Sequence, residues 1–182
     1  MASLDLALRD ALAGRACVVG VGNSQLGDDG AGPRVAEALT AAGHANVIVA
    51  ETTPERWMET LSSGHYDSVL FVDAVEFEGD PGAALLMDAT EIETHFPQVS
   101  THKLSLGTVA RLIRRQSGAR VHLLGVRPQS LAPGAGLSAP VMESVTGLAT
   151  LLGDVLTKRT AGAERPAPES GEKSVQAKCE AR

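Results

Sequence analysis

The sequence predicts an α/β fold, a three-layer sandwich in which helices cover both faces of a five-stranded, mostly parallel, twisted sheet with one antiparallel strand. Short apolar, β-branched runs alternate with longer segments whose apolar residues recur at helical spacing. Such alternation is typical of right-handed crossovers on a parallel sheet. One linker between strands is polar and too short for a crossover helix, so the strand after it should be antiparallel.

The N-terminal part of the chain predicts a helix, a strand, a second helix and a second strand. Ser3 can cap a short amphipathic helix, which Gly14 ends. Residues 16–21 are continuously apolar, as in a strand that is buried on both faces. After a loop, Pro33 favours the first turn of a helix, and the apolar residues 47–50 predict the second strand.

A third helix and two further strands follow. Thr53 and Pro54 predict the cap and first turn of a helix. This helix should bury three apolar side chains, those of Trp57, Met58 and Leu61. Residues 68–72 predict the third buried strand. The polar linker 73–82 then leads to the strand near 83–87, which we expect to be antiparallel.

The rest of the chain predicts four more elements and a tail. The elements are a helical turn at 90–96, a helix that Ser100 or Thr101 caps and that ends at Gly118, a strand at 121–126 and a last helix from 138. From residue 159 onward prolines and charges dominate and Val175 is the single β-branched aliphatic residue, which predicts disorder. We therefore expect one α/β domain over residues 1–158 and a disordered polar tail over 159–182.

Composition limits the class of function. The 182 residues are 43% hydrophobic and carry a net charge of −6, so the chain can bury a core but offers no basic surface to a nucleic acid or an anionic membrane. The two cysteines, Cys17 and Cys179, are too few for a disulfide framework or a cysteine-based zinc site. The N-terminus is acidic, and no run approaches the roughly 18–20 apolar residues of a membrane span. We expect a cytoplasmic monomer.

The loop after the first strand, residues 20–30, allows two interpretations. It begins Gly-Val-Gly like a dinucleotide-binding fingerprint, but Gln25 stands in place of the third glycine. Asp28 and Asp29 precede the next helix, where negative charge would repel a phosphate, although Glu51 could bind a ribose. The other interpretation is that a carboxylate in this loop binds a cation.

Carboxylates at two strand ends favour the cation site. Asp73 follows the third strand, and the carboxyl ends of parallel strands share one edge of a sheet, where open α/β folds bind ligands. Asp28 or Asp29 should therefore meet Asp73 in one cleft. Each of these acids alone is more typical of a solvated turn or a helix cap. Their joint position shifts the balance toward a metal site.

His102 could complete such a site. It lies at a predicted helix start, which lowers the pKa of an imidazole and favours its neutral, metal-binding form, although a histidine there is more often structural. The other four histidines are most simply structural: His44, His65, His95 and His122. The chain has no G-x-S-x-G or H-E-x-x-H motif and no Walker lysine, and Cys17 lies inside a strand. An enzyme built on this chain would use carboxylates and a metal.

Three motifs in order carry a resemblance to a known family. They read Gly-Val-Gly-Asn at 20–23 with Asp-Asp-Gly-Ala-Gly at 28–32, Phe-Val-Asp-Ala at 71–74, and Ser-Thr-His-Lys-Leu at 100–104. In order and approximate spacing they resemble the nickel–iron hydrogenase maturation endopeptidases, over roughly residues 16–156. The resemblance implies an α/β sandwich and a nickel-dependent hydrolase, which removes a C-terminal extension from the hydrogenase large-subunit precursor.

The resemblance also implies a site. Carried over by motif, its catalytic residues and metal ligands are Asp29, Asp73 and His102, where other members have glutamate in place of Asp29. The cofactor would be Ni²⁺, and we expect the substrate to supply it, because two carboxylates and one imidazole form a weak, open site. One departure is the turn after the second strand, residues 51–54, which lacks the family's usual glycines. This departure leaves the shape of the substrate cleft, and hence the partner, open.

Two other hypotheses stay open from the sequence. The first is a nickel-sensing chaperone that docks on the precursor without cutting it. The second is a degenerate dinucleotide-binding domain. Only a protease shortens the precursor, and only a nucleotide-binding domain binds a dinucleotide at micromolar concentration, so these two observations separate the three hypotheses.

Overall fold

The computed structural model describes residues 4–95 and 105–160. Within them five strands form one sheet in the order β2-β1-β3-β5-β4. The strands are β1 (Ala16–Val21), β2 (Val47–Glu51), β3 (Ser68–Ala74), β4 (Ala84–Asp88) and β5 (Arg120–Val126). Strands β2, β1, β3 and β5 run parallel, and β4 pairs with β5 in the antiparallel sense. The predicted sheet, including its antiparallel strand, is confirmed.

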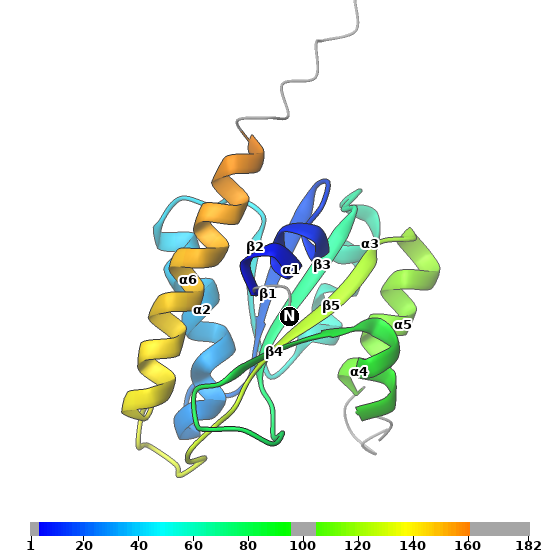
Figure 1. Ribbon diagram of the computed structural model, residues 1–182. Helices are drawn as coiled ribbons and strands as arrows, with labels where there is room; N and C mark the ends of the chain where they lie inside the picture. The colour runs from blue at the N-terminus through cyan, green and yellow to red at the C-terminus, as the bar shows by residue number, and fades with distance from the viewer. Residues whose placement is uncertain (1–3, 96–104, 161–182) are drawn as a thin grey trace, which may run out of the picture.

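Helices cover both faces of this sheet (Figure 1). The described helices are α1 (Leu4–Ala11), η1 (Gly27–Gly30), α2 (Ala31–Ala41), η2 (Pro54–Trp57), α3 (Met58–Ser63), α4 (Ala89–His95), α5 (Leu106–Ser117) and α6 (Ala139–Thr160). Helices α1, α2 and α6 lie on one face, where Leu8, Leu39 and Leu152 pack against Val18 and Leu70 of the sheet. Helices α3, α4 and α5 cover the other face with Leu61, Ile92 and Ile113, against Phe71 and Leu123.

The third helix differs from its prediction in one side chain. Leu61 is buried and Met58 half-buried, as expected, but Trp57 is 36% exposed. The reason is that residues 54–57 form the 3₁₀ turn η2 before α3 begins. A 3₁₀ turn has three residues per turn instead of 3.6, so the helical spacing that grouped Trp57 with Leu61 does not apply across this boundary.

Helix α5 also begins later than expected. Its N-cap is Ser105, whose hydroxyl accepts a hydrogen bond from the Thr108 N–H at 3.2 Å. The caps expected at Ser100 and Thr101 lie outside the described residues. Helix α5 ends as predicted at Gly118, which has the left-handed conformation (φ 73°) that favours glycine.

Helix α6 is long and apolar enough, by length and composition, to cross a membrane, which we did not expect from the sequence. Its apolar side chains nevertheless pack against α2, α1 and the sheet. The buried positions recur at helical spacing: Val141, Val145, Leu148, Leu152 and Val155. The opposite side carries Glu143, Asp154 and Lys158, all exposed. This is the pattern of an amphipathic core helix. The predicted tail begins at 159, whereas α6 continues to Thr160 and residues from 161 lie outside the described part.

Candidate active site

The carboxyl ends of β1 and β3 bring the two sequence-predicted carboxylates to one place. Strands β1 and β3 are hydrogen-bonded neighbours, and Gly20 pairs with Val72. Asp73 therefore stands one residue beyond that pair, beside the loop that leaves β1. This loop carries Asp29 in the 3₁₀ turn η1, which leads into α2.

Two glycines let this loop and helix α2 lie directly on the strand ends. A Cβ atom on Gly32 would be 2.1 Å from the carbonyl oxygen of Val72 and 2.2 Å from that of Val21. A Cβ atom on Gly22 would be 1.9 Å from the Asp29 carbonyl oxygen and 3.4 Å from Asp73 Oδ1. Gly22 also has a φ of 130°, which other residues rarely adopt. The glycines of the first motif therefore permit the approach of Asp29 to Asp73.

Each carboxylate is held by one backbone amide. Asp29 Oδ2 accepts a hydrogen bond from the Asn23 N–H at 2.8 Å, and Asp73 Oδ1 accepts one from the Ala74 N–H at 2.8 Å. Both side chains are half-buried. Burial, and then the negative charge of Asp29, raise the pKa of Asp73 to about 7. The two carboxylates thus repel each other, and a cation bound between them would relieve that repulsion.

Asp28, the neighbour of Asp29, has a different environment. Its side chain is fully buried and accepts hydrogen bonds from the backbone N–H groups of Gln129, Ser130 and Ser138 and from the Ser138 hydroxyl. Burial alone would raise the pKa of Asp28, but these hydrogen bonds lower it below the usual value. Asp28 is therefore occupied by protein donors, and Asp29 is the carboxylate of this loop that can take a metal.

The third predicted ligand, His102, lies outside the described residues, so the structure does not test the complete set of three. Among the residues that are described, no group of three or more histidines, cysteines, aspartates or glutamates could hold a metal ion. His122, one of the histidines interpreted as structural, lies on β5, where burial and then the charge of Arg120 lower its pKa.

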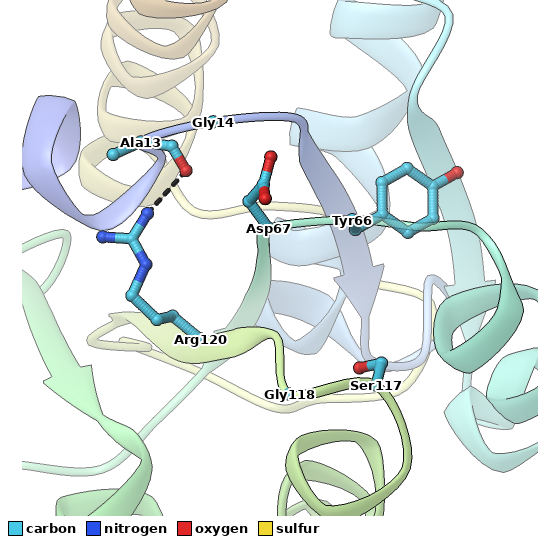
Figure 2. Close-up of a pocket in the computed structure, with 7 residues that line it drawn as sticks. All are labelled: Ala13, Gly14, Tyr66, Asp67, Ser117, Gly118 and Arg120. Carbon is cyan, nitrogen blue, oxygen red and sulfur yellow. Dashed lines mark hydrogen bonds between the residues drawn. The ribbon is translucent and has the colours of Figure 1, made fainter.

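A depression of about 430 Å³ lies at the opposite, amino-terminal edge of the sheet (Figure 2). Its polar groups are already paired: Arg120 donates to the carbonyl oxygens of Asp10 and Ala13, and Asp67 accepts from the Arg15 N–H at 2.6 Å. The Arg15 guanidinium also stacks 5.1 Å from the centre of the Tyr66 ring. These contacts connect the end of α1 and the segment before β1 to the starts of β3 and β5, so we assign this depression a structural role.

Cys17 offers no alternative nucleophile. It is fully buried in β1, and burial raises the pKa of its thiol to about 12. The thiolate is therefore scarce at neutral pH. The described residues leave the two carboxylates at the carboxyl edge as the candidate catalytic groups.

Fold and site together define an α/β sandwich protein with a pair of acidic side chains at the carboxyl edge of its sheet, at the ends of the neighbouring strands β1 and β3. Known proteins match the chain. A family model for the hydrogenase maturation protease HycI matches residues 33–154. The hydrogenase 3 maturation protease of Escherichia coli (strain K12) is 30% identical over 127 residues, which are 69% of this chain and 80% of that protein.

Solved structures agree in fold. HycI, a [NiFe] hydrogenase maturation protease from Thermococcus kodakarensis KOD1, superposes with a TM-score of 0.75 at 30% identity, over 83% of this chain and 99% of that one. The hydrogenase maturating endopeptidase HybD from E. coli gives a TM-score of 0.64 at 27% identity, over 82% and 94%. The chain belongs to the hydrogenase maturation protease family. It is an endopeptidase, hence a hydrolase, which favours the protease over the chaperone and the nucleotide-binding domain.

Proposed function

We propose that this protease removes the C-terminal extension of a [NiFe] hydrogenase large-subunit precursor in the cytoplasm, and that nickel bound to the precursor is required for cutting. The observation that carries the proposal is the pair of neighbouring carboxylates, Asp29 and Asp73, whose mutual repulsion raises the pKa of Asp73 beyond the effect of burial alone. The names of the relatives support the substrate, since they are maturation proteases of hydrogenases. The shortage of cysteines supports a reducing compartment.

The donor set fits nickel. Asp29, Asp73 and His102 would hold the ion with two carboxylates and one imidazole, ligands that suit a divalent transition metal and leave coordination positions open. When bound, the ion would polarise the scissile carbonyl and lower the pKa of a coordinated water. The charge repulsion at the Asp29–Asp73 pair is the structural feature that a cation would relieve.

The chain's own residues orient these ligands. The Asn23 N–H holds Asp29 Oδ2 and the Ala74 N–H holds Asp73 Oδ1, so each carboxylate has a second oxygen toward which no other described residue donates a hydrogen bond. In the metal-free protein Asp73 can hold a proton near neutral pH, because its pKa is about 7. A cation on its free oxygen would displace that proton, so we assign Asp73 the role of a ligand and not that of the group that moves the proton.

A paired digest tests the proposal. The purified protease is incubated with nickel-loaded and with nickel-free precursor, and mass spectrometry follows the precursor C-terminus. We expect a shortened product from the loaded precursor alone. Equal cutting of both forms would overturn the nickel requirement, and binding without shortening would point to the chaperone.

Matched variants identify the residues. Asp29→Ala, Asp73→Ala and His102→Ala should each abolish cutting while the circular dichroism spectrum stays native. Asp67→Asn is the control, because Asp67 also accepts a backbone N–H but lies at the opposite edge of the sheet. Cutting that survives in any of the three alanine variants would remove that residue from the site.

A further inference from the structure

We propose that Asp28 is a positioning residue, which holds Asp29 in place by joining the turn η1 to the β5–α6 loop, defined as residues 127–138. The role given to Asp29 rests on the proposed function. The role given to Asp28 rests on its contacts. Asp28 itself touches neither metal nor substrate in this proposal.

The side chain of Asp28 is the centre of the connection. Its Oδ2 atom accepts from the N–H groups of Gln129 at 2.8 Å and Ser130 at 2.9 Å and from the Ser138 hydroxyl at 2.9 Å. Its Oδ1 atom accepts from the Ser138 N–H at 2.6 Å. One buried carboxylate thus binds both the start and the end of the loop, with four donors and no exposed surface.

The backbone adds to this connection. The Asp28 N–H donates to the Ser130 carbonyl at 2.9 Å, and the Gly134 N–H donates to the Gln25 carbonyl at 2.9 Å. A Cβ atom on Gly27 would lie 2.6 Å from the Ser130 carbonyl oxygen, so the two segments are in direct contact. The β5–α6 loop therefore lies along residues 25–28, at the carboxyl edge of the sheet where β5 ends (Figure 1).

Asp28 and Asp29 are successive residues of one 3₁₀ turn with different partners. Asp28 binds the β5–α6 loop, whereas Asp29 accepts from the Asn23 N–H and lies near Asp73. The turn is therefore fixed from both sides. Loss of the Asp28 side-chain contacts would leave the turn held by Asn23 and by the backbone hydrogen bonds with Ser130 and Gly134. The spacing of Asp29 and Asp73 would then vary more.

Two measurements on Asp28→Asn test the inference. The substitution keeps the size of the side chain but places an NH₂ group among N–H donors. Amide hydrogen exchange at Asn23 reports whether Asp29 Oδ2 is still held, and we expect exchange about tenfold faster or more, the loss typical of a charged hydrogen bond. With nickel-loaded precursor, kcat should fall about tenfold or more while KM changes less than about threefold, because the defect lies in the reacting groups and not in docking.

Three further variants serve as controls. Ser138→Ala removes a single donor and should speed amide exchange at Asn23 about two- to threefold and lower kcat by a similar factor. Ser138→Thr keeps the hydroxyl, so its exchange rate and kcat should be close to those of the wild type. Asp67→Asn should change neither. Where Asp28→Asn fails to fold, the Ser138 pair decides the question.

The inference is overturned if Asp28→Asn, or Ser138→Ala in its place, lowers the melting temperature but leaves Asn23 exchange and kcat unchanged. Asp28 would then stabilise the fold without positioning Asp29. Failure of the proposed function gives a different result: the wild-type protease would not shorten the loaded precursor, or Asp29→Ala would still cut it. Asn23 exchange would still decide the role of Asp28 in that case, because it requires no activity.

Discussion

Asp73, at the end of β3, titrates near pH 7 because it is partly buried and because Asp29, in the turn after β1, adds its negative charge. The glycines at 22 and 32 make this proximity possible, since a side chain at either position would occupy the space between the turn and the strand ends. Close packing of the backbone at these glycines therefore places the two carboxylates near each other.

The raised pKa of Asp73 predicts how the stability of the metal-free protein depends on pH. The folded state keeps its proton up to a pKa of about 7, whereas the unfolded state releases it near 3.8, so the free energy of unfolding should fall as the pH rises between these values. Asp73→Asn should remove this decline and stabilise the metal-free protein at pH 8 by on the order of 2 kcal/mol. Urea unfolding at pH 5 and pH 8 measures it. A wild-type stability that rises over this range contradicts the prediction.

The charge of Asp29 predicts a second shift at the same site. Asp29→Asn should lower the pKa of Asp73, because the substitution removes one of the two causes that raise it. Carboxyl ¹³C chemical shifts, followed through a pH titration of the metal-free proteins, give the pKa of Asp73 in the wild type and in the variant. The same variant should lose cutting, whereas Asp29→Glu keeps a carboxylate and should retain part of it. Equal activity of the Asn and Glu variants would mean that the carboxylate at this position is not used.

Gly22→Ala should disrupt the site more than it disrupts the fold. The new Cβ atom would lie 1.9 Å from the Asp29 carbonyl, and the φ of 130° disfavours alanine, so the turn must move away from Asp73. We expect a loss of about 2–4 kcal/mol in the free energy of unfolding and no detectable cutting. Gly147→Ala in α6 is the matched control: nothing lies within 4 Å of its Cβ, and it should stabilise the protein by about 0.5–1 kcal/mol. Thermal melts and the precursor digest are the measurements.

Much of this architecture could be predicted from the sequence, because buried parallel strands are apolar and β-branched and a short polar linker such as 73–82 excludes a crossover helix. The convergence of Asp73 with an acid after β1 followed from strand direction alone. The choice between Asp28 and Asp29 did not, since the partners of Asp28 lie about a hundred positions away along the chain. The prediction that Trp57 is buried was wrong, because residues 54–57 form a 3₁₀ turn and not a turn of α-helix. His102 stays a prediction.

The Asp28 carboxylate should also make the free energy of unfolding fall at acid pH. Its hydrogen bonds lower its pKa in the folded state below the unfolded value of 3.8, so their stabilisation is complete above that value and is lost as the pH falls through the folded pKa. Wild-type protein should therefore lose stability steeply below about pH 4, and Asp28→Asn should show a flatter decline there, from a lower starting stability. Urea unfolding at pH 6, 4 and 3 measures both slopes. Equal slopes of unfolding free energy against pH in the two proteins would mean that the Asp28 carboxylate does not gain its charge-dependent hydrogen bonds on folding. The connection between η1 and the β5–α6 loop would then depend on the backbone contacts of Ser130 and Gly134.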